Sequence, residues 1–306
     1  MTFYIIGHRG MGAAPLKNGK MRNGELPENT LLSFWVALKR GVEGVELDVH
    51  LSRDGVPMVI HSSELGEKIP HDINGGPIKG EVQDFTAREL KAYALGRGQL
   101  IPTLHEALSL SVRFNAQVRC NKPRPIVNIE LKKAETAGPT HRVVDEFLRS
   151  AQLDVANIVF CSFKWNALEE LRAANPHYRV APMLKTERIF GADQVMEPDY
   201  RVKPGATVLP RLFVEIANQH KRMPFDAIDC VVQDIRPEII DFCQKRGLGL
   251  FTSVSSYRPK IGPLDGVMEV LEDAASKLPF VAFKVDRPDR VVAMRRKACN
   301  MAAKPL

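Results

Sequence analysis

Short apolar runs rich in β-branched and aromatic residues recur along the whole chain, and amphipathic helical patterns lie between several of them. Runs of this length and composition are typical of buried strands. Their alternation with helices predicts an α/β protein whose parallel sheet is covered by helices. The predicted strands are residues 3–6, 44–49, 57–60, 126–131, 158–161, 179–183, 228–232, 248–252 and 280–285.

The predicted helix at residues 31–38 has the clearest signals. Thr30 is a favourable N-cap, an apolar stripe includes Phe34 and Leu38, and Gly41 follows the last turn. Similar patterns predict helices at residues 142–150 and 165–174.

The nine predicted strands are one more than a closed (β/α)8 barrel requires, and the link from Asp48 to His61 is too short for a full crossover helix. Either one strand lies outside the barrel or one crossover is abbreviated. We favour a TIM-type barrel over an open doubly wound sheet because the chemically distinctive residues fall near strand ends, where barrels place their sites.

Two stretches are longer than ordinary connections. Residues 62–99, rich in glycine and charge, predict an inserted loop or small subdomain at about 62–100, and residues 185–224 predict a long loop. Both are expected at the C-terminal face of one barrel domain spanning residues 1–306, where they would select the substrate.

Charge and composition narrow the class of protein. The 306 residues are 44% apolar and 26% charged, with a formal charge of +7, which suits a globular protein with an anionic ligand. The basic runs lack interleaved aromatic residues, so no nucleic-acid partner is expected. No apolar run approaches the ~20 residues of a membrane helix, and residues 4–7 are too short for a secretory signal, so we expect a cytoplasmic protein with reduced, scattered cysteines.

Carboxylates cluster in two of the predicted strands. The strand period of two places Glu46, Asp48 and His50 on one face, and Glu130 ends the run at 126–131. Buried acids need a cation or basic side chains, so a metal site and a structural salt-bridge network are both open. His50 is expected to serve mainly as a hydrogen-bonding group.

The acids at 46, 48 and 130 favour an oxygen-preferring cation, Mg²⁺ or Ca²⁺, over zinc. Arg9 and Lys132 would offset the remaining negative charge and hold an anionic group of the substrate. His8 follows the first strand and His61 the third, and two such histidines can accept and supply protons. Together these residues indicate metal-assisted phosphodiester hydrolysis.

Several motifs resemble, in order and style, those of the glycerophosphodiester phosphodiesterase family over roughly residues 5–290. They are GHRG, PENTLLSF, ELDVHLSRDGVPMVIH, IPTLHEAL, VNIELK, CSF and DRPDR. The resemblance implies a TIM-type barrel that hydrolyses small-molecule glycerophosphodiesters, such as glycerophosphocholine or glycerophosphoethanolamine, to glycerol 3-phosphate and an alcohol.

The resemblance also implies residue roles. Glu46, Asp48 and Glu130 match the family's metal ligands, and His8 and His61 match its acid/base pair. Phosphate-contacting residues are matched by Arg9 and Lys132, and the family's ENT position near the metal is matched by Glu28 and Asn29. Which histidine is the acid, whether water or the glycerol 2-hydroxyl attacks, and the oligomeric state stay open.

Two positions depart from the family pattern, which usually has aspartate at the position of Ser62 and tryptophan at or near Phe251. With Ser62, His61 lacks an aspartate neighbour that would orient its ring or tune its charge. With Phe251, the shape of the pocket for the alcohol or glycerol is expected to differ. Two other functions are open: a barrel similar to sphingomyelinase D or to phosphoinositide phospholipases, and a non-catalytic barrel that binds a phosphorylated ligand.

Overall fold

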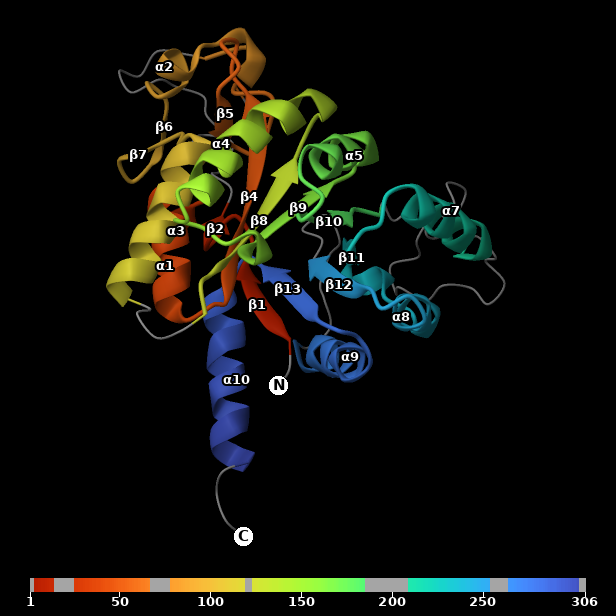
Figure 1. The fold of residues 1–306 in the computed structure, drawn as a ribbon. Helices are drawn as coiled ribbons and strands as arrows, with labels where there is room; N and C mark the ends of the chain where they lie inside the picture. Colours follow the sequence, from red (N-terminus) through yellow and green to blue (C-terminus); the bar gives the residue numbers. More distant parts are fainter. Residues whose placement is uncertain are drawn as a thin grey trace.

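The computed structural model describes residues 3–13, 25–66, 78–118, 123–184, 209–253 and 264–302. Eight parallel strands form one sheet in the order β10-β9-β8-β4-β1-β13-β12-β11. These strands are β1 (Tyr4–Gly7), β4 (Gly44–Leu51), β8 (Ile126–Leu131), β9 (Ile158–Ser162), β10 (Arg179–Pro182), β11 (Ala227–Val231), β12 (Gly249–Ser253) and β13 (Val281–Val285). The sheet curls into a nearly closed TIM-type barrel surrounded by helices, as predicted (Figure 1).

The two edge strands, β10 and β11, meet through a few backbone contacts. Met183 and Asp229 form a parallel bridge, and the Leu184 amide donates to the Asp229 carbonyl at 2.7 Å. The ninth predicted strand is β5 (Pro57–Val59), which pairs antiparallel with β4 outside the ring. This pairing with β5 explains why β4 continues to Leu51, beyond its predicted end.

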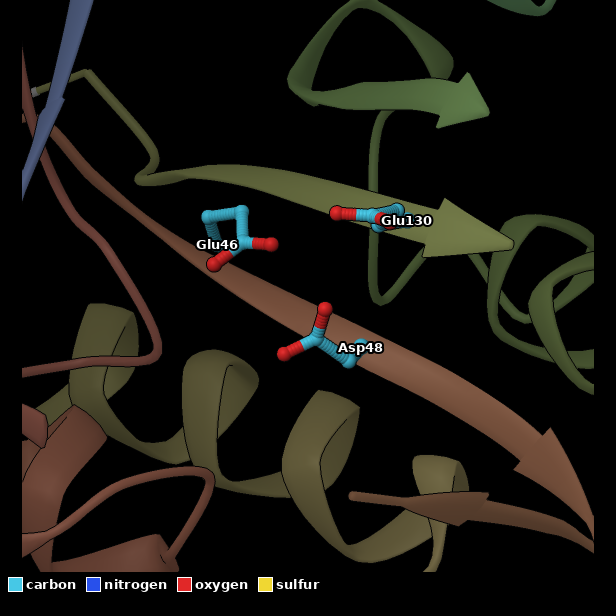
Figure 2. A group of neighbouring side chains, drawn as sticks. All are labelled: Glu46, Asp48 and Glu130. Atoms are coloured by element: carbon cyan, nitrogen blue, oxygen red, sulfur yellow. The ribbon is translucent and has the colours of Figure 1, made fainter. Parts of the chain in front are cut away.

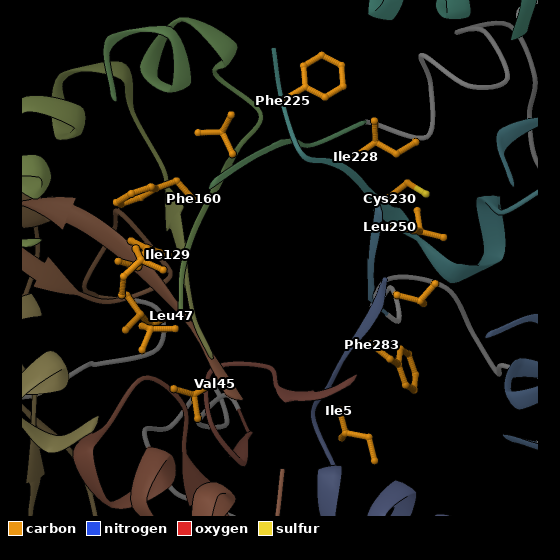
Figure 3. Packing of buried hydrophobic residues seen from close by; sticks show 14 of the residues in the cluster. Ile5, Val45, Leu47, Ile129, Phe160, Phe225, Ile228, Cys230, Leu250 and Phe283 are labelled. Carbon is orange, nitrogen blue, oxygen red and sulfur yellow. The ribbon is translucent and has the colours of Figure 1, made fainter. Parts of the chain in front are cut away.

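A helix follows each barrel strand and packs on the outside of the ring. These helices are α1 (Leu31–Arg40), α3 (Leu104–Val118), α4 (Ala137–Arg149), α5 (Trp165–Ala174), α7 (Leu209–Arg222), α8 (Pro237–Gln244), α9 (Leu264–Lys277) and α10 (Pro288–Ala302). The main apolar core lies between strands and helices, where outward-facing side chains such as Leu47, Phe160 and Phe283 are buried (Figure 3). The inward positions are thereby left for a smaller apolar cluster and for polar groups.

Local signals account for most helix boundaries. The Thr30 side chain accepts from the Ser33 amide, and Gly41 ends α1 with a φ of 99°. Helix α5 has the predicted bounds. Helix α4 begins at Ala137 rather than near residue 142, because the short η2 turn (Ala134–Thr136) leads directly into it.

The insertion after β5 contains elements of its own. They are the turn η1 (Val82–Asp84), helix α2 (Ala87–Leu90) and the antiparallel pair β6 (Ala94–Gly96) and β7 (Gln99–Leu100). A second apolar cluster, which includes Met58, Leu65 and Leu90, joins these elements to β5. Residues 67–77 of the predicted insertion lie outside the described residues.

The prediction of a long loop at 185–224 is wrong over its second part, where α7 occupies Leu209–Arg222. Leu212 and Ile216 of this helix are buried against the barrel. Phe213 stacks on Phe242 with the ring centroids 4.6 Å apart. Pro210 lies in the first turn of this helix, where proline is tolerated. Residues 185–208 lie outside the described residues.

The predictions that the chain has no membrane helix and that its cysteines are reduced can be compared with the described residues only. No helix there combines the length and apolarity that a membrane crossing requires. Cys161, Cys230 and Cys243 are buried free thiols. Cys120 and the side chain of Cys299 are outside the described part.

Gly44 is needed for close contact between strands, because a Cβ there would lie 2.4 Å from the Ile126 carbonyl oxygen and 2.9 Å from Ile6 Cδ1. We expect Gly44→Ala to lower the free energy of unfolding by about 1–3 kcal/mol, measured by urea titration. Gly266→Ala is the matched control, since a Cβ there meets nothing within 4 Å, and in a helix it should stabilise by roughly 0.5–1 kcal/mol. Equal effects of the two substitutions would contradict this account of Gly44.

Candidate active site

Three buried carboxylates converge inside the barrel. Glu46 and Asp48 project from the same face of β4, and Glu130 of β8 lies in register with Asp48. One oxygen from each residue lies within 4.8 Å of the others (Figure 2). Two oxygens bound to one Mg²⁺ or Ca²⁺ at ~2.0–2.6 Å are at most about 5 Å apart, so this spacing fits a single hard cation.

Basic side chains neutralise part of this negative charge. Lys132 Nζ lies 2.7 Å from Asp48 Oδ1 and 2.6 Å from Glu130 Oε1, and Arg9 Nε lies 3.3 Å from Asp48 Oδ2. The Glu46 Oε1 atom is buried and has no hydrogen-bond partner among the described residues. A buried carboxylate oxygen left in this state is costly unless a cation or donor binds it, so the residues fit a metal ion.

A tight turn after β1 places the first histidine and the arginine. Arg9 has a φ of 53°, and its backbone amide donates to Glu46 Oε2 at 2.8 Å. Gly10 has a φ of 86°, and a Cβ there would lie 2.5 Å from Ser33 Oγ. Helix α1 therefore packs so closely against this turn that only glycine fits, and the turn is held against the carboxylates.

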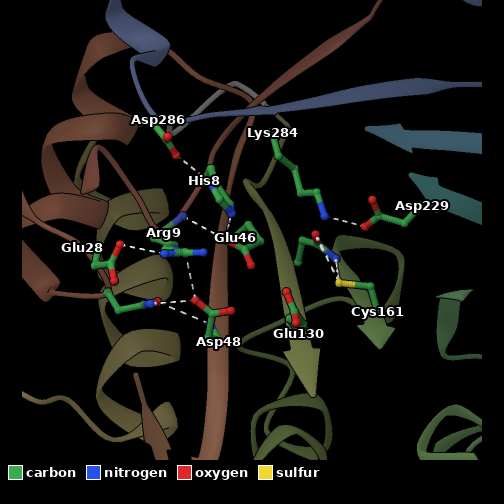
Figure 4. A network of polar contacts seen from close by, with 12 residues as sticks. His8, Arg9, Glu28, Glu46, Asp48, Glu130, Cys161, Asp229, Lys284 and Asp286 are labelled. Carbon is green, nitrogen blue, oxygen red and sulfur yellow. Dashed lines mark hydrogen bonds and ion pairs between the residues drawn. The ribbon is translucent and has the colours of Figure 1, made fainter. Parts of the chain in front are cut away.

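Glu28 and Asn29 support Arg9 and Asp48. Arg9 Nη1 donates to Glu28 Oε2 at 2.8 Å, and Asn29 Nδ2 donates to Asp48 Oδ2 at 2.7 Å. Asn29 has a φ of 55°, and its backbone amide bonds to the Arg9 carbonyl at 3.1 Å. The segment before α1 thus holds the turn after β1 and the acid of β4 in one network (Figure 4).

The His8 ring is fixed by two acids. Its Nδ1 lies 2.6 Å from Asp286 Oδ1, and its Nε2 lies 3.9 Å from Glu46 Oε2. Burial by itself would lower the pKa of His8, but Glu46 and Asp286 outweigh burial and the nearby Arg9 charge, so the pKa is raised. The ring is thereby oriented with Nε2 toward the carboxylates.

The two acids of β4 differ in their titration. Burial raises the pKa of Glu46 to about 7, and the charge of Asp48 adds to this effect. Burial acts in the same direction on Asp48, but the positive charges of Lys132, Arg9 and His61 hold its pKa well below the usual range. His61 therefore lies close enough to Asp48 for its charge to matter, and its carbonyl oxygen accepts from His50 Nε2 at 3.2 Å.

A model of the glycerophosphoryl diester phosphodiesterase family matches residues 8–252. The chain belongs to this family. A glycerophosphodiester phosphodiesterase from Caldanaerobacter subterraneus subsp. tengcongensis is 28% identical over 261 residues, which cover 82% of this chain and 85% of that protein. The family resemblance read from the motifs is confirmed.

Two solved structures of phosphodiesterases share the fold. The glycerophosphodiester phosphodiesterase of Agrobacterium tumefaciens has a TM-score of 0.59 at 23% identity, covering 95% of this chain and 99% of that one. A phosphodiesterase of Oleispira antarctica, solved with the product sn-glycerol-3-phosphate, has a TM-score of 0.64 at 19% identity and covers 96% of both chains.

The structure adds polar residues for which the sequence suggested no role in the family reaction. Asp286 follows β13 directly, as His8 follows β1, and it is the first residue of the DRPDR motif, which gave it no individual role. Lys284 and Asp229 form a buried ion pair at 2.5 Å between β13 and β11. A charge within an apolar strand was the available signal for both.

The two departures from the family pattern lie in different surroundings. Phe251 is buried on the inward side of β12, against Phe280 with ring centroids 5.6 Å apart. Both rings line a cavity of about 560 Å³ among residues at the amino-terminal ends of the strands, including Tyr4 and Ile126. Ser62 is half-buried next to His61. Phe251 thus faces the end of the barrel away from the turn that carries His8.

Cation binding should depend on pH through Glu46. Because the pKa of Glu46 is raised to about 7 without a cation, this group is neutral below that pH, and the affinity for Mg²⁺ or Ca²⁺ should fall about tenfold per pH unit. Calorimetric titration at about pH 8 and pH 6 measures the change. Glu46→Gln should bind weakly at both pH values. An affinity of the unmodified protein that is equal at both would contradict the assignment.

Proposed function

We propose that this protein hydrolyses glycerophosphodiesters to glycerol 3-phosphate and an alcohol, using a divalent cation, Mg²⁺ or Ca²⁺. The observation that carries the proposal is the convergence of Glu46, Asp48 and Glu130 on one point, with His8 held beside them. Membership of the phosphodiesterase family agrees with this chemistry.

The charges of the site favour a divalent cation. Four negative charges, on Glu28 and the three carboxylates, meet the two positive charges of Arg9 and Lys132, which gives a sum of −2. A divalent cation brings this sum to zero, so a phosphodiester with its single negative charge can enter without net repulsion. When bound, the cation would withdraw charge from the phosphoryl oxygens and so stabilise the transition state.

The basic residues are proposed to bind phosphate. Lys132 and Arg9 are each about 15% exposed at the side chain, more than the carboxylates they contact. Glu28 and Asn29 keep the guanidinium and Asp48 in place. An arginine held in this way presents its remaining N–H groups in a fixed direction, which suits a phosphate oxygen.

The two histidines are proposed to move protons. One accepts a proton from the attacking oxygen and the other supplies one to the departing alkoxide. Asp286 orients His8 through Nδ1, leaving Nε2 for the substrate. His61 follows β5, where the Ile60 amide donates to the Asp48 carbonyl at 3.0 Å, so the chain brings His61 next to Asp48.

A panel of glycerophosphodiesters with different alcohols, each assayed with Mg²⁺ and with Ca²⁺, tests the function. Glycerol 3-phosphate should be released from at least one of them, and a chelator should abolish its release because the acids alone leave the site negatively charged. Release of a cyclic phosphate as the end product would indicate a phospholipase-like reaction. No cation-dependent cleavage of any diester would overturn the proposal.

Loss of either proton-transfer group should impair turnover. His8→Ala and His61→Ala are each expected to lower kcat at least ~10²-fold without changing the thermal midpoint of unfolding by much. His105→Ala is a matched control, since its side chain is 54% exposed on α3 and contacts Glu146. Near-normal activity of both variants would remove the histidines from the reaction.

A further inference from the structure

A second buried polar pair faces the barrel interior across from the acids of β4. Lys284 of β13 and Asp229 of β11 are 2% and 1% exposed at the side chain, and Lys284 Nζ lies 2.5 Å from Asp229 Oδ2. Figure 4 shows the Lys284 side chain extending toward Asp229 on the side of Glu46 away from Arg9. The Lys284 charge acts on both Glu46 and Cys161, so the pair belongs to the same interior.

One atom of this pair has an unmet hydrogen-bonding requirement. Asp229 Oδ1 is buried and has no hydrogen-bond partner among the described residues, as is true of Glu46 Oε1 in the cation cluster. Leaving a charged acceptor unsatisfied inside a protein costs free energy, whereas an apolar pair of similar size would not. Unsatisfied carboxylate oxygens in both regions of one barrel interior point to a ligand that reaches both regions.

We propose that Asp229 positions the glycerol end of the substrate by accepting a hydrogen bond from one of its hydroxyl groups through Oδ1. Lys284 is a positioning residue that fixes the carboxylate by holding Oδ2. This inference rests on the proposed function and adds to it the part of the substrate that is recognised.

The charge and space of the pair favour a hydroxyl group over a cationic headgroup. Lys284 already neutralises Asp229, so the pair has no net negative charge to attract choline or ethanolamine. Both side chains are almost fully buried, which suits a small donor better than a bulky ammonium group. A site that hydrogen-bonds a hydroxyl group rejects analogues that lack it, because the buried acceptor then stays unpaired.

The test removes both charges together, because removal of one would leave the other buried and unpaired. The variant is Asp229→Val with Lys284→Met. Its matched control is Glu43→Gln with Arg295→Met. This control removes a different, partly buried ion pair, in which Arg295 Nη2 of α10 lies 2.5 Å from Oε1 of Glu43, the residue before β4. Lys284→Arg keeps the charge pair and serves as the conservative variant.

The variants are compared on glycerophosphocholine, glycerophosphoethanolamine and bis(4-nitrophenyl) phosphate, which lacks glycerol hydroxyl groups. For the Asp229/Lys284 double variant, kcat/KM should fall about tenfold or more on both glycerol substrates and stay within about threefold on the nitrophenyl diester. The control and Lys284→Arg should keep the original ratio between substrates. An equal loss on all three substrates would make the pair structural and overturn the inference.

Binding without turnover separates this inference from the proposed function. Calorimetry should show that the unmodified protein binds glycerol 3-phosphate more tightly than ethyl phosphate, and that the double variant loses this preference. If no diester is hydrolysed but the preference is present and lost as described, the proposed function fails and the positioning role stands. If the unmodified protein binds both phosphates equally, or the double variant keeps the preference, the positioning role is overturned.

Discussion

The balance of charge around three buried carboxylates is the constraint on which the arrangement of the site depends. Glu46, Asp48 and Glu130 are almost completely shielded from water, and ionised acids in such a place require compensation. Lys132 and Arg9 supply part of it, but Glu46 keeps an oxygen without a hydrogen-bond partner and a raised pKa. A divalent cation would neutralise the remaining negative charge. Binding would then recover free energy that burial of the acids costs, and this recovered free energy contributes to the affinity for the ion.

The barrel makes this balance possible because it separates apolar from polar positions on each strand. Outward residues of β4 and β8, such as Leu47 and Ile129, pack into the main core, and the alternate positions carry the acids. The parallel register places Asp48 beside Glu130, and hydrogen bonds along β4 prevent either from turning outward. A packed outer layer thus holds a polar interior that would be unstable by itself.

The turn after β1 shows how backbone geometry contributes to the same balance. Arg9 and Asn29 both have positive φ values, which is unusual for residues other than glycine, and each bonds to an acid of β4. The conformations persist because Gly10 lets α1 pack against the turn without a clash. Backbone strain at these residues is therefore offset by contacts with the carboxylates.

The sequence alone determined the class of fold and all eight barrel strands. It also determined that Glu46, Asp48 and Glu130 lie on strands, because strand period and residue type are local properties. Only the tertiary structure decided that β5 lies outside the ring, that residues 209–222 are helical, and that Asp286 anchors His8. It also brought Lys284 and Asp229 together, although they are 55 positions apart in the chain. Pairing between distant strands depends on how the sheet closes, and no local pattern of residues records that closure.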